Sequence, residues 1–154
     1  MSTRSTLTIR TDNSTLHFYR HMDGYVAGAG QTLQVALEEA YKKAVQPYQV
    51  YSRLVKAIMM NQYPASEYRS TQSMYEVTEH AHLHSDREYH YDVYINKAGY
   101  VNIEVEAWLP NFDEKTQRHE VIYDGGFDGY KDLVTKEMVI IAERVAELEK
   151  KRGA

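Results

Sequence analysis

The spacing of apolar residues changes period along this chain, and that change restricts the folds it can adopt. Apolar residues alternate with polar ones over residues 7–18 and 75–107, which is typical of half-buried strands. Over residues 33–58 and 133–148 they recur every three to four positions, which is typical of helices with one buried face. Separate blocks of the two periods predict an α+β fold. We expect a single domain, residues 1–154, in which an antiparallel sheet of about five strands packs against about three helices.

The predicted strands form an N-terminal hairpin and a three-stranded meander. A turn at residues 12–14 joins the strands of the N-terminal hairpin. In the meander, residues 97–99 fit a three-residue hairpin loop with glycine in the left-handed position, which sets Ile95 opposite Val101. Residues 118–123 are expected to add a short strand. The first strand of the meander is expected to present Tyr75, Val77, Ala81 and Leu83 on its core face.

Three segments are predicted to be helical. The first carries a buried stripe between Leu33 and Ala44, and the second begins near Pro47 and ends before Pro64. Asp128 is expected to cap the third and longest helix. The intramolecular core is expected to cover the apolar stripe of this last helix, which consists of Leu133, Val134, Met138, Ile141, Val145 and Leu148.

The composition excludes several classes of protein. No cysteine occurs in the 154 residues, so disulfides, thiolate nucleophiles and zinc fingers are excluded, and a reducing compartment fits. A formal net charge of −4 argues against nonspecific nucleic-acid binding, which relies on clustered Lys and Arg. No stretch reaches the ~20 apolar residues that cross a bilayer. We therefore expect a cytoplasmic protein that binds neither nucleic acid nor membrane, and we predict no cofactor.

Period-two alternation also predicts a polar sheet face that carries several histidines. The meander register places His90 opposite Glu106, with His80 or His82 next to His90 across the other hairpin. Imidazole and carboxylate groups suit zinc, iron or manganese. A metal site would be drawn from His80, His82, His90, Asp92 and Glu106.

Two alternatives to a metal site remain open for this face. It is either an ordinary solvated surface on which opposite charges pair across strands, or a surface that a partner or second subunit covers. Proximity to Asp92 and Glu106 would raise the pKa values of His80, His82 and His90, because a nearby carboxylate favours the imidazolium.

A glycine-containing loop precedes the first predicted helix. Exposed amides and the helix dipole favour an anion at a helix N-terminus, and a nearby arginine could add charge-assisted hydrogen bonds. The alternative is that the glycines serve backbone geometry alone. The candidate ligand-binding residues are Arg4, Tyr19, Arg20, His21, Asp23, Tyr25, Gly28 and Gly30.

Three short segments of the chain carry a resemblance to a known family. They are residues 3–5 (Thr-Arg-Ser), the loop of residues 19–30, and residues 86–91 (Asp-Arg-Glu-Tyr-His-Tyr). In these segments the chain resembles an uncharacterised family of bacteriophages and some bacteria. Val26 replaces the proline that is usual in that family's loop. The resemblance implies a phage origin, and therefore the cytoplasm of the host cell, but it assigns no reaction.

The sequence supports three functional hypotheses. The first is a non-enzymatic accessory protein that binds a host protein or a small anionic, nucleotide-like ligand, as a means of countering host defence. In its nucleotide version Tyr19 or Tyr25 stacks on the base, and Arg4 and Arg20 contact phosphate. The second is a metal-dependent hydrolase that uses the sheet-face histidines. The third is a self-associating structural protein, a homodimer formed through the tyrosine-rich surface or the last helix.

Overall fold

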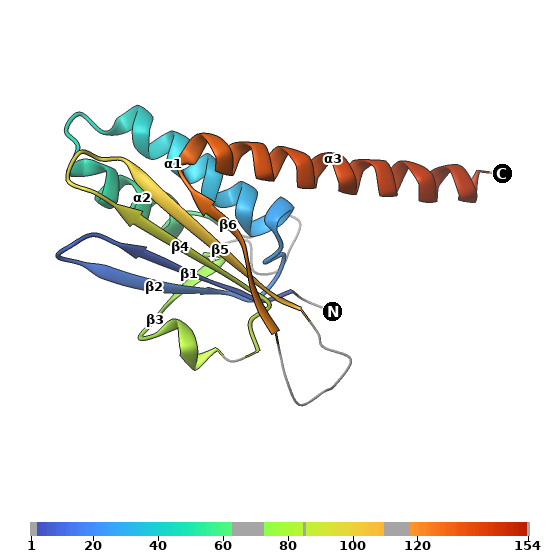
Figure 1. Cartoon of the computed structure of the whole chain (residues 1–154), viewed down its shortest axis with the longest axis horizontal. Coiled ribbons are helices and arrows are strands. Elements are labelled where there is room, and N and C mark those ends of the chain that lie inside the picture. The colour runs from blue at the N-terminus through green and yellow to red at the C-terminus, as the bar shows by residue number, and fades with distance from the viewer. Residues whose placement is uncertain (1–2, 63–72, 85, 110–117, 154) are drawn as a thin grey trace.

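Six strands form one sheet in the order β3-β2-β1-β4-β5-β6 (Figure 1). The structure is a computed structural model that describes residues 3–62, 73–84, 86–109 and 118–153. The strands are β1 (Ser5–Arg10), β2 (Thr15–Arg20), β3 (Tyr75–Thr78), β4 (Tyr89–Ile95), β5 (Val101–Leu109) and β6 (Arg118–Gly125). The helices are η1 (Val26–Gly30), α1 (Gln31–Lys43), α2 (Gln49–Met59), η2 (Ala81–Leu83) and α3 (Phe127–Arg152).

Both predicted hairpins form, and the register predicted for the second one is confirmed. β1 pairs with β2 in antiparallel orientation, with Leu7 opposite Phe18 on the buried side. β4 pairs with β5 and places Ile95 opposite Val101. Gly99 closes that turn at φ 86°, a backbone angle that favours glycine. Local turn chemistry and alternation are sufficient to specify these pairings.

The prediction of a wholly antiparallel sheet was wrong, because β1 and β4 are parallel neighbours at its centre. The predicted meander does not form either, since β3 pairs with β2 and not with β4. β3 ends at Thr78, and Ala81 and Leu83 lie in the short 3₁₀ helix η2 and not in a strand. The segment that contains η2 carries the chain from one side of the β1–β2 hairpin to the other. The sheet is therefore mixed and has six strands.

Helices α1, α2 and α3 lie on one face of this sheet (Figure 1). As predicted, the apolar stripe of α1 is buried, and so are Leu54 and Ile58 of α2. They pack on the apolar side of β1, β4 and β5, where Ile9, Val93 and Ile103 are each 0% exposed. No helix in the described part of the chain has the length and hydropathy needed to cross a membrane.

Helix α3 departs from prediction at both ends. Gly126 is its N-cap, and Asp128 lies inside the first turn. Tyr130 and Val134 are buried and Leu133 is partly buried, but the rest of the helix continues beyond the sheet (Figure 1). The expectation that the core covers the whole stripe was wrong for Met138, Ile141, Val145 and Leu148, which are all exposed.

Candidate functional site

The amides of the glycine-containing loop already have backbone acceptors. Gly28 N donates to Tyr25 O (2.9 Å), Ala29 N donates to Asp23 O (2.7 Å), and Gly30 N also reaches Tyr25 O (3.4 Å). The loop forms η1, a short π-helix that continues directly into α1. An anion at this helix start would have to compete with those bonds, so the sequence-based reason for placing a ligand here is weakened.

Arg20, a predicted phosphate contact, is buried and is 4% exposed. Its Nε donates to Met22 O (2.8 Å) and its Nη1 donates to Thr32 Oγ1 (2.9 Å). The guanidinium also lies 5.5 Å from the centre of the Tyr75 ring. These contacts tie the end of β2 to the start of α1, and they turn the Arg20 charge inward, away from a ligand in solvent.

The three segments that carry the family resemblance meet in space. Gly24 N donates to Thr3 O (2.9 Å), and Glu88 N donates to Arg4 O (2.8 Å). The buried Tyr91 hydroxyl donates to Gly24 O (2.8 Å), and Arg4 forms an ion pair with Asp86 (3.3 Å). A Cβ on Gly24 would lie 2.7 Å from the Ser5 Cβ, so only glycine fits this junction. These residues thus have a structural role at one junction.

Tyr19 and His21, two of the predicted ligand residues, lie together at the exposed edge of the junction formed by the three segments. The Tyr19 hydroxyl lies 3.3 Å from His21 Nδ1, and the Tyr19 ring stacks on His84 with centroids 4.0 Å apart. Burial raises the pKa of the Tyr19 hydroxyl, and Asp86 adds to this effect while Arg4 opposes it. Gly28 and Gly30 are not part of this edge, because they pack against Asp23, Val26 and Tyr130.

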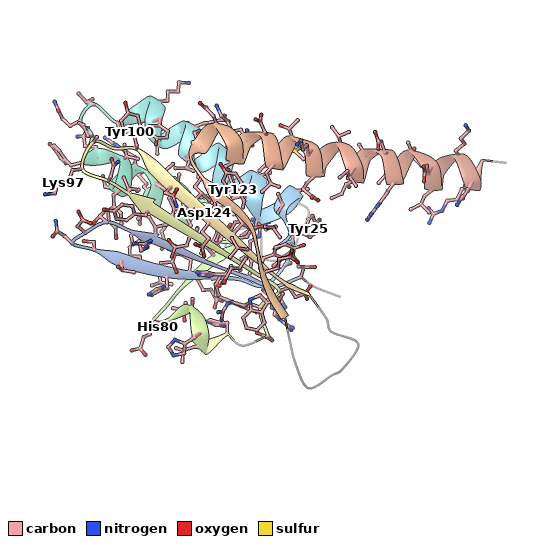
Figure 2. The ribbon with its side chains drawn as sticks, viewed as in Figure 1. Tyr25, His80, Lys97, Tyr100, Tyr123 and Asp124 are labelled. Carbon is pink, nitrogen blue, oxygen red and sulfur yellow. The ribbon has the colours of Figure 1, made fainter. Side chains whose placement is uncertain are left out.

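The face of the sheet that α1, α2 and α3 do not cover carries the histidines, but they are not grouped as predicted. His90 lies opposite Glu106, as expected from the β4–β5 register. His80 and His82 instead lie near His17 of β2, because β3 pairs with β2. The His17 and His80 rings stack with centroids 4.9 Å apart, and those of His80 and His82 are 4.1 Å apart. Figure 2 shows that Tyr25 and His80 lie in different parts of the molecule. Tyr19, at the start of the predicted loop segment, nevertheless stacks on His84 of the histidine segment.

The described residues contain no group of three His, Asp or Glu side chains placed to hold a metal ion. β1 lies between β2 and β4, so it separates His80 and His82 from His90, Asp92 and Glu106. The arrangement leaves the imidazoles as stacked and hydrogen-bonded pairs. Thr8 Oγ1, for example, lies 2.8 Å from His17 Nδ1.

The predicted rise in the pKa of His90 was wrong. Burial, together with the smaller effect of the Arg87 charge, lowers the pKa of His90 to about 4, against the opposing effect of Asp92. A hydrogen bond of 2.7 Å joins His90 Nδ1 and Thr6 Oγ1. The pKa of His17 is also lowered, by burial first and then by His80. Desolvation therefore outweighs the carboxylates at these two histidines.

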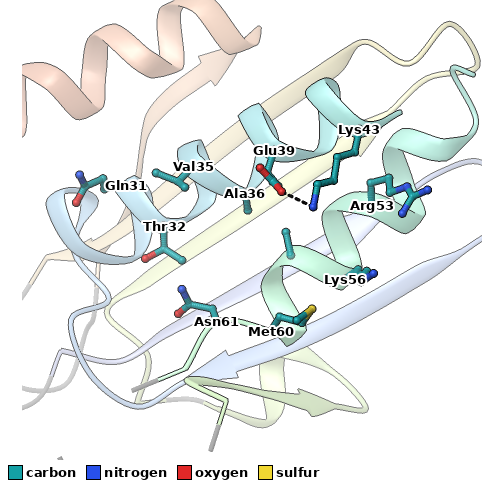
Figure 3. Close-up of a pocket in the computed structure, with 11 residues that line it drawn as sticks. Gln31, Thr32, Val35, Ala36, Glu39, Lys43, Arg53, Lys56, Met60 and Asn61 are labelled. Atoms are coloured by element: carbon teal, nitrogen blue, oxygen red, sulfur yellow. Dashed lines mark ion pairs between the residues drawn. The ribbon is translucent and has the colours of Figure 1, made fainter. Parts of the chain in front are cut away.

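A groove between α1 and α2 was not predicted from the sequence (Figure 3). It is a cavity of about 550 Å³, within the roughly 300–1,000 Å³ typical of small-ligand pockets. Its apolar lining comes from both helices: Val35, Ala36, Ala57 and Met60. Since α1 and α2 bury their apolar stripes against the sheet, these residues lie where the two helices face each other at the outer surface.

One end of the groove is lined mainly by basic side chains. Lys43, Arg53 and Lys56 are three cations, against the single carboxylate of Glu39. Lys43 pairs with Glu39 at 2.7 Å, whereas Arg53 and Lys56 form no ion pair with described residues. The groove is therefore locally basic on a chain whose formal net charge is −4.

At the other end of the groove, Asn61 Oδ1 is buried and has no hydrogen-bond partner among the described residues. Thr32 also lines this end, and its hydroxyl is already held by Arg20 and by Gly28 O, to which it donates (3.2 Å). An acceptor that has no donor and that solvent does not reach is costly, and it adds no hydrogen-bonding group to the groove surface. The sequence signal for this site was the concentration of cations between residues 43 and 56.

Comparison of the chain with known protein families, curated proteins and solved structures finds no match. The resemblance to a phage and bacterial family therefore stays a prediction from three short segments. Any functional conclusion has to rest on the geometry and charge of the groove between α1 and α2.

Proposed function

We propose that this chain is a binding protein for a small anionic ligand of the nucleotide class, held in the groove between α1 and α2. The observation that carries the proposal is the combination of an apolar cavity with Arg53 and Lys56, two cations that no described carboxylate neutralises. A planar base fits the apolar walls, and the guanidinium of Arg53 offers paired donors to phosphate oxygens.

The two ends of the groove match the two ends of such a ligand. Phosphate lies at the basic end, beside Lys43, Arg53 and Lys56. The base lies between the apolar walls of the groove, toward Thr32 and Asn61. The proposed nucleotide site is therefore the groove between α1 and α2 and not the glycine-containing loop. The loop then acts indirectly, because Arg20 fixes Thr32 at the groove wall.

The motif resemblance implies a phage origin, and a phage origin suggests a biological role for nucleotide binding. A nucleotide-binding accessory protein in an infected cell would withdraw a nucleotide signal from the host. Binding alone is enough for that role.

Thermal unfolding in the presence of nucleotides tests the proposal. A ligand at 100 times its Kd stabilises the folded state by about 2.7 kcal/mol, which raises the Tm of a chain of this size by roughly 5–10 °C. The panel contains nucleoside monophosphates, cyclic dinucleotides and inorganic phosphate. Lys56→Glu should abolish the shift by placing a carboxylate beside the phosphate. Lys136→Glu, the same change at an exposed position on α3, should leave it intact.

Each ligand in the panel separates one possibility from the others. A nucleotide shift that Lys56→Glu removes supports the proposal, and an equal shift with inorganic phosphate would limit recognition to the phosphate group. Absence of a shift with every nucleotide at millimolar concentration would contradict the proposal.

A further inference from the structure

Helix α3 carries one apolar stripe that passes from the core into solvent. Tyr130 and Val134 are 0% and 1% exposed, whereas Val145 and Leu148 are 48% and 58% exposed on the same side of the helix. In Figure 1 this second half of α3 runs clear of the sheet. A helix of about 15 residues has marginal stability in water on its own, so residues 138–152 gain most from a partner along this stripe.

The spacing of the stripe is that of a coiled coil. From Val134, the apolar residues Met138, Ile141, Val145 and Leu148 follow at intervals of four, three, four and three residues. This is the alternation of a and d positions in a heptad repeat, which packs best against a second helix with the same repeat. A second copy of α3 provides such a helix.

We propose that the projecting half of α3 pairs with the same segment of a second copy as an antiparallel two-stranded coiled coil. The body of the fold decides the orientation. Tyr130 and Val134 are covered by the chain's own core, which occupies the space that a parallel partner helix would need at these positions. An antiparallel partner instead passes only along residues 138–152, and its own core lies beyond the C-terminal end.

One register closes the exposed apolar layers and also pairs an acidic with a basic side chain. In this register Met138 faces Leu148 of the second copy, and Ile141 faces Val145 of the second copy. The two-fold axis repeats both contacts, which gives four apolar layers. The same register sets Glu137 beside Lys151 of the second copy.

Sedimentation equilibrium over roughly 1–200 µM chain tests the association, since a dimer with micromolar Kd dissociates within that range. Wild-type protein should reach twice the chain mass of 17.9 kDa. Val145→Asp should reduce it to the monomer. Val139→Asp is the matched control, because Val139 is 50% exposed but lies about 120° around the helix from Val145. Circular dichroism confirms that both variants remain folded.

A monomer at every concentration, or an assembly larger than two chains, would overturn the proposal. If Val145→Asp and Val139→Asp dissociated the dimer to the same extent, the assignment of the interface to the stripe from Val134 to Leu148 would be overturned.

Single cysteines test the orientation, because the natural chain has none. Antiparallel pairing predicts that an equimolar mixture of Met138→Cys and Leu148→Cys forms a mixed disulfide under mild oxidation. Leu148→Cys alone should not cross-link, since its two copies lie about 15 Å apart along the helix axis. Efficient cross-linking of Leu148→Cys alone would show parallel pairing and overturn the proposed geometry.

Discussion

Protonation of His90 should destabilise this protein at mildly acidic pH. Its pKa in the folded chain is about 4, against an ordinary value of 6.5 for an unfolded chain. Between these values the unfolded state binds more protons, so the free energy of unfolding decreases as the pH falls from about 6.5 toward 4. At about pH 7.5 and above both states hold neutral His90, and the effect is absent.

The magnitude follows from the two pKa values. The full difference is worth about 3 kcal/mol, and the part developed between pH 7 and pH 5 is about 2 kcal/mol. Most carboxylates remain ionised in that interval, which makes the histidine contribution the dominant one. Urea denaturation at the two pH values should show a midpoint lower by about 1 M at pH 5.

His90→Asn removes the titrating group while leaving a side-chain nitrogen near Thr6 Oγ1, where His90 Nδ1 now bonds. This variant should lose most of the pH dependence. His82→Asn, a change at an exposed histidine, should keep it. The reasoning is refuted if wild-type protein and His90→Asn show the same change in stability between pH 7 and pH 5, or if NMR titration places His90 at or above 6.5.

Two further predictions concern the glycine-containing loop as a structural element. Gly28→Ala should lower the free energy of unfolding by about 1–3 kcal/mol, because its Cβ would collide with the Asp23 carbonyl oxygen. Gly153→Ala is the control, since a Cβ at Gly153 would lie 3.5 Å from the Glu149 carbonyl oxygen, an ordinary contact, and equal stability of the two variants would contradict the packing argument. Arg20→Lys should cost about 1–3 kcal/mol in chemical denaturation, since a lysine cannot make both the Met22 and Thr32 bonds from this buried position. An Arg20→Lys variant of unchanged stability that fails to bind nucleotide would instead restore the loop as a ligand site.

The sequence was informative where structure depends on neighbours along the chain. The β1–β2 and β4–β5 hairpins follow from alternation and from Gly99 in a left-handed turn. The buried stripes of α1 and α2 follow from helical spacing. The register of β4 and β5 placed His90 opposite Glu106 correctly. Each of these features is fixed by contacts over short sequence distances, which a residue pattern records directly.

The candidate site was not predictable in the same way. The groove needs α1 beside α2 in space, and the sequence shows its cations, Lys43, Arg53 and Lys56, only as a basic stretch that spans two helices. The sequence favours Arg20 as a ligand contact because burial cannot be read from a loop sequence, and the structure turns this side chain inward. The predicted direction of the His90 pKa was wrong for the same reason, since desolvation depends on what covers the face.

The amino-acid sequence by itself determined the strands of the β1–β2 and β4–β5 hairpins and the helices α1 and α2 with their buried faces. Only the tertiary structure decided that β1 and β4 are parallel, that β3 joins β2 at the edge, and that α3 extends past the core. The physical reason is that strand order and the reach of a helix depend on contacts between distant segments. Apolar spacing shows that a stripe such as Val134 to Leu148 needs burial, but not whether its own chain or a second copy provides it.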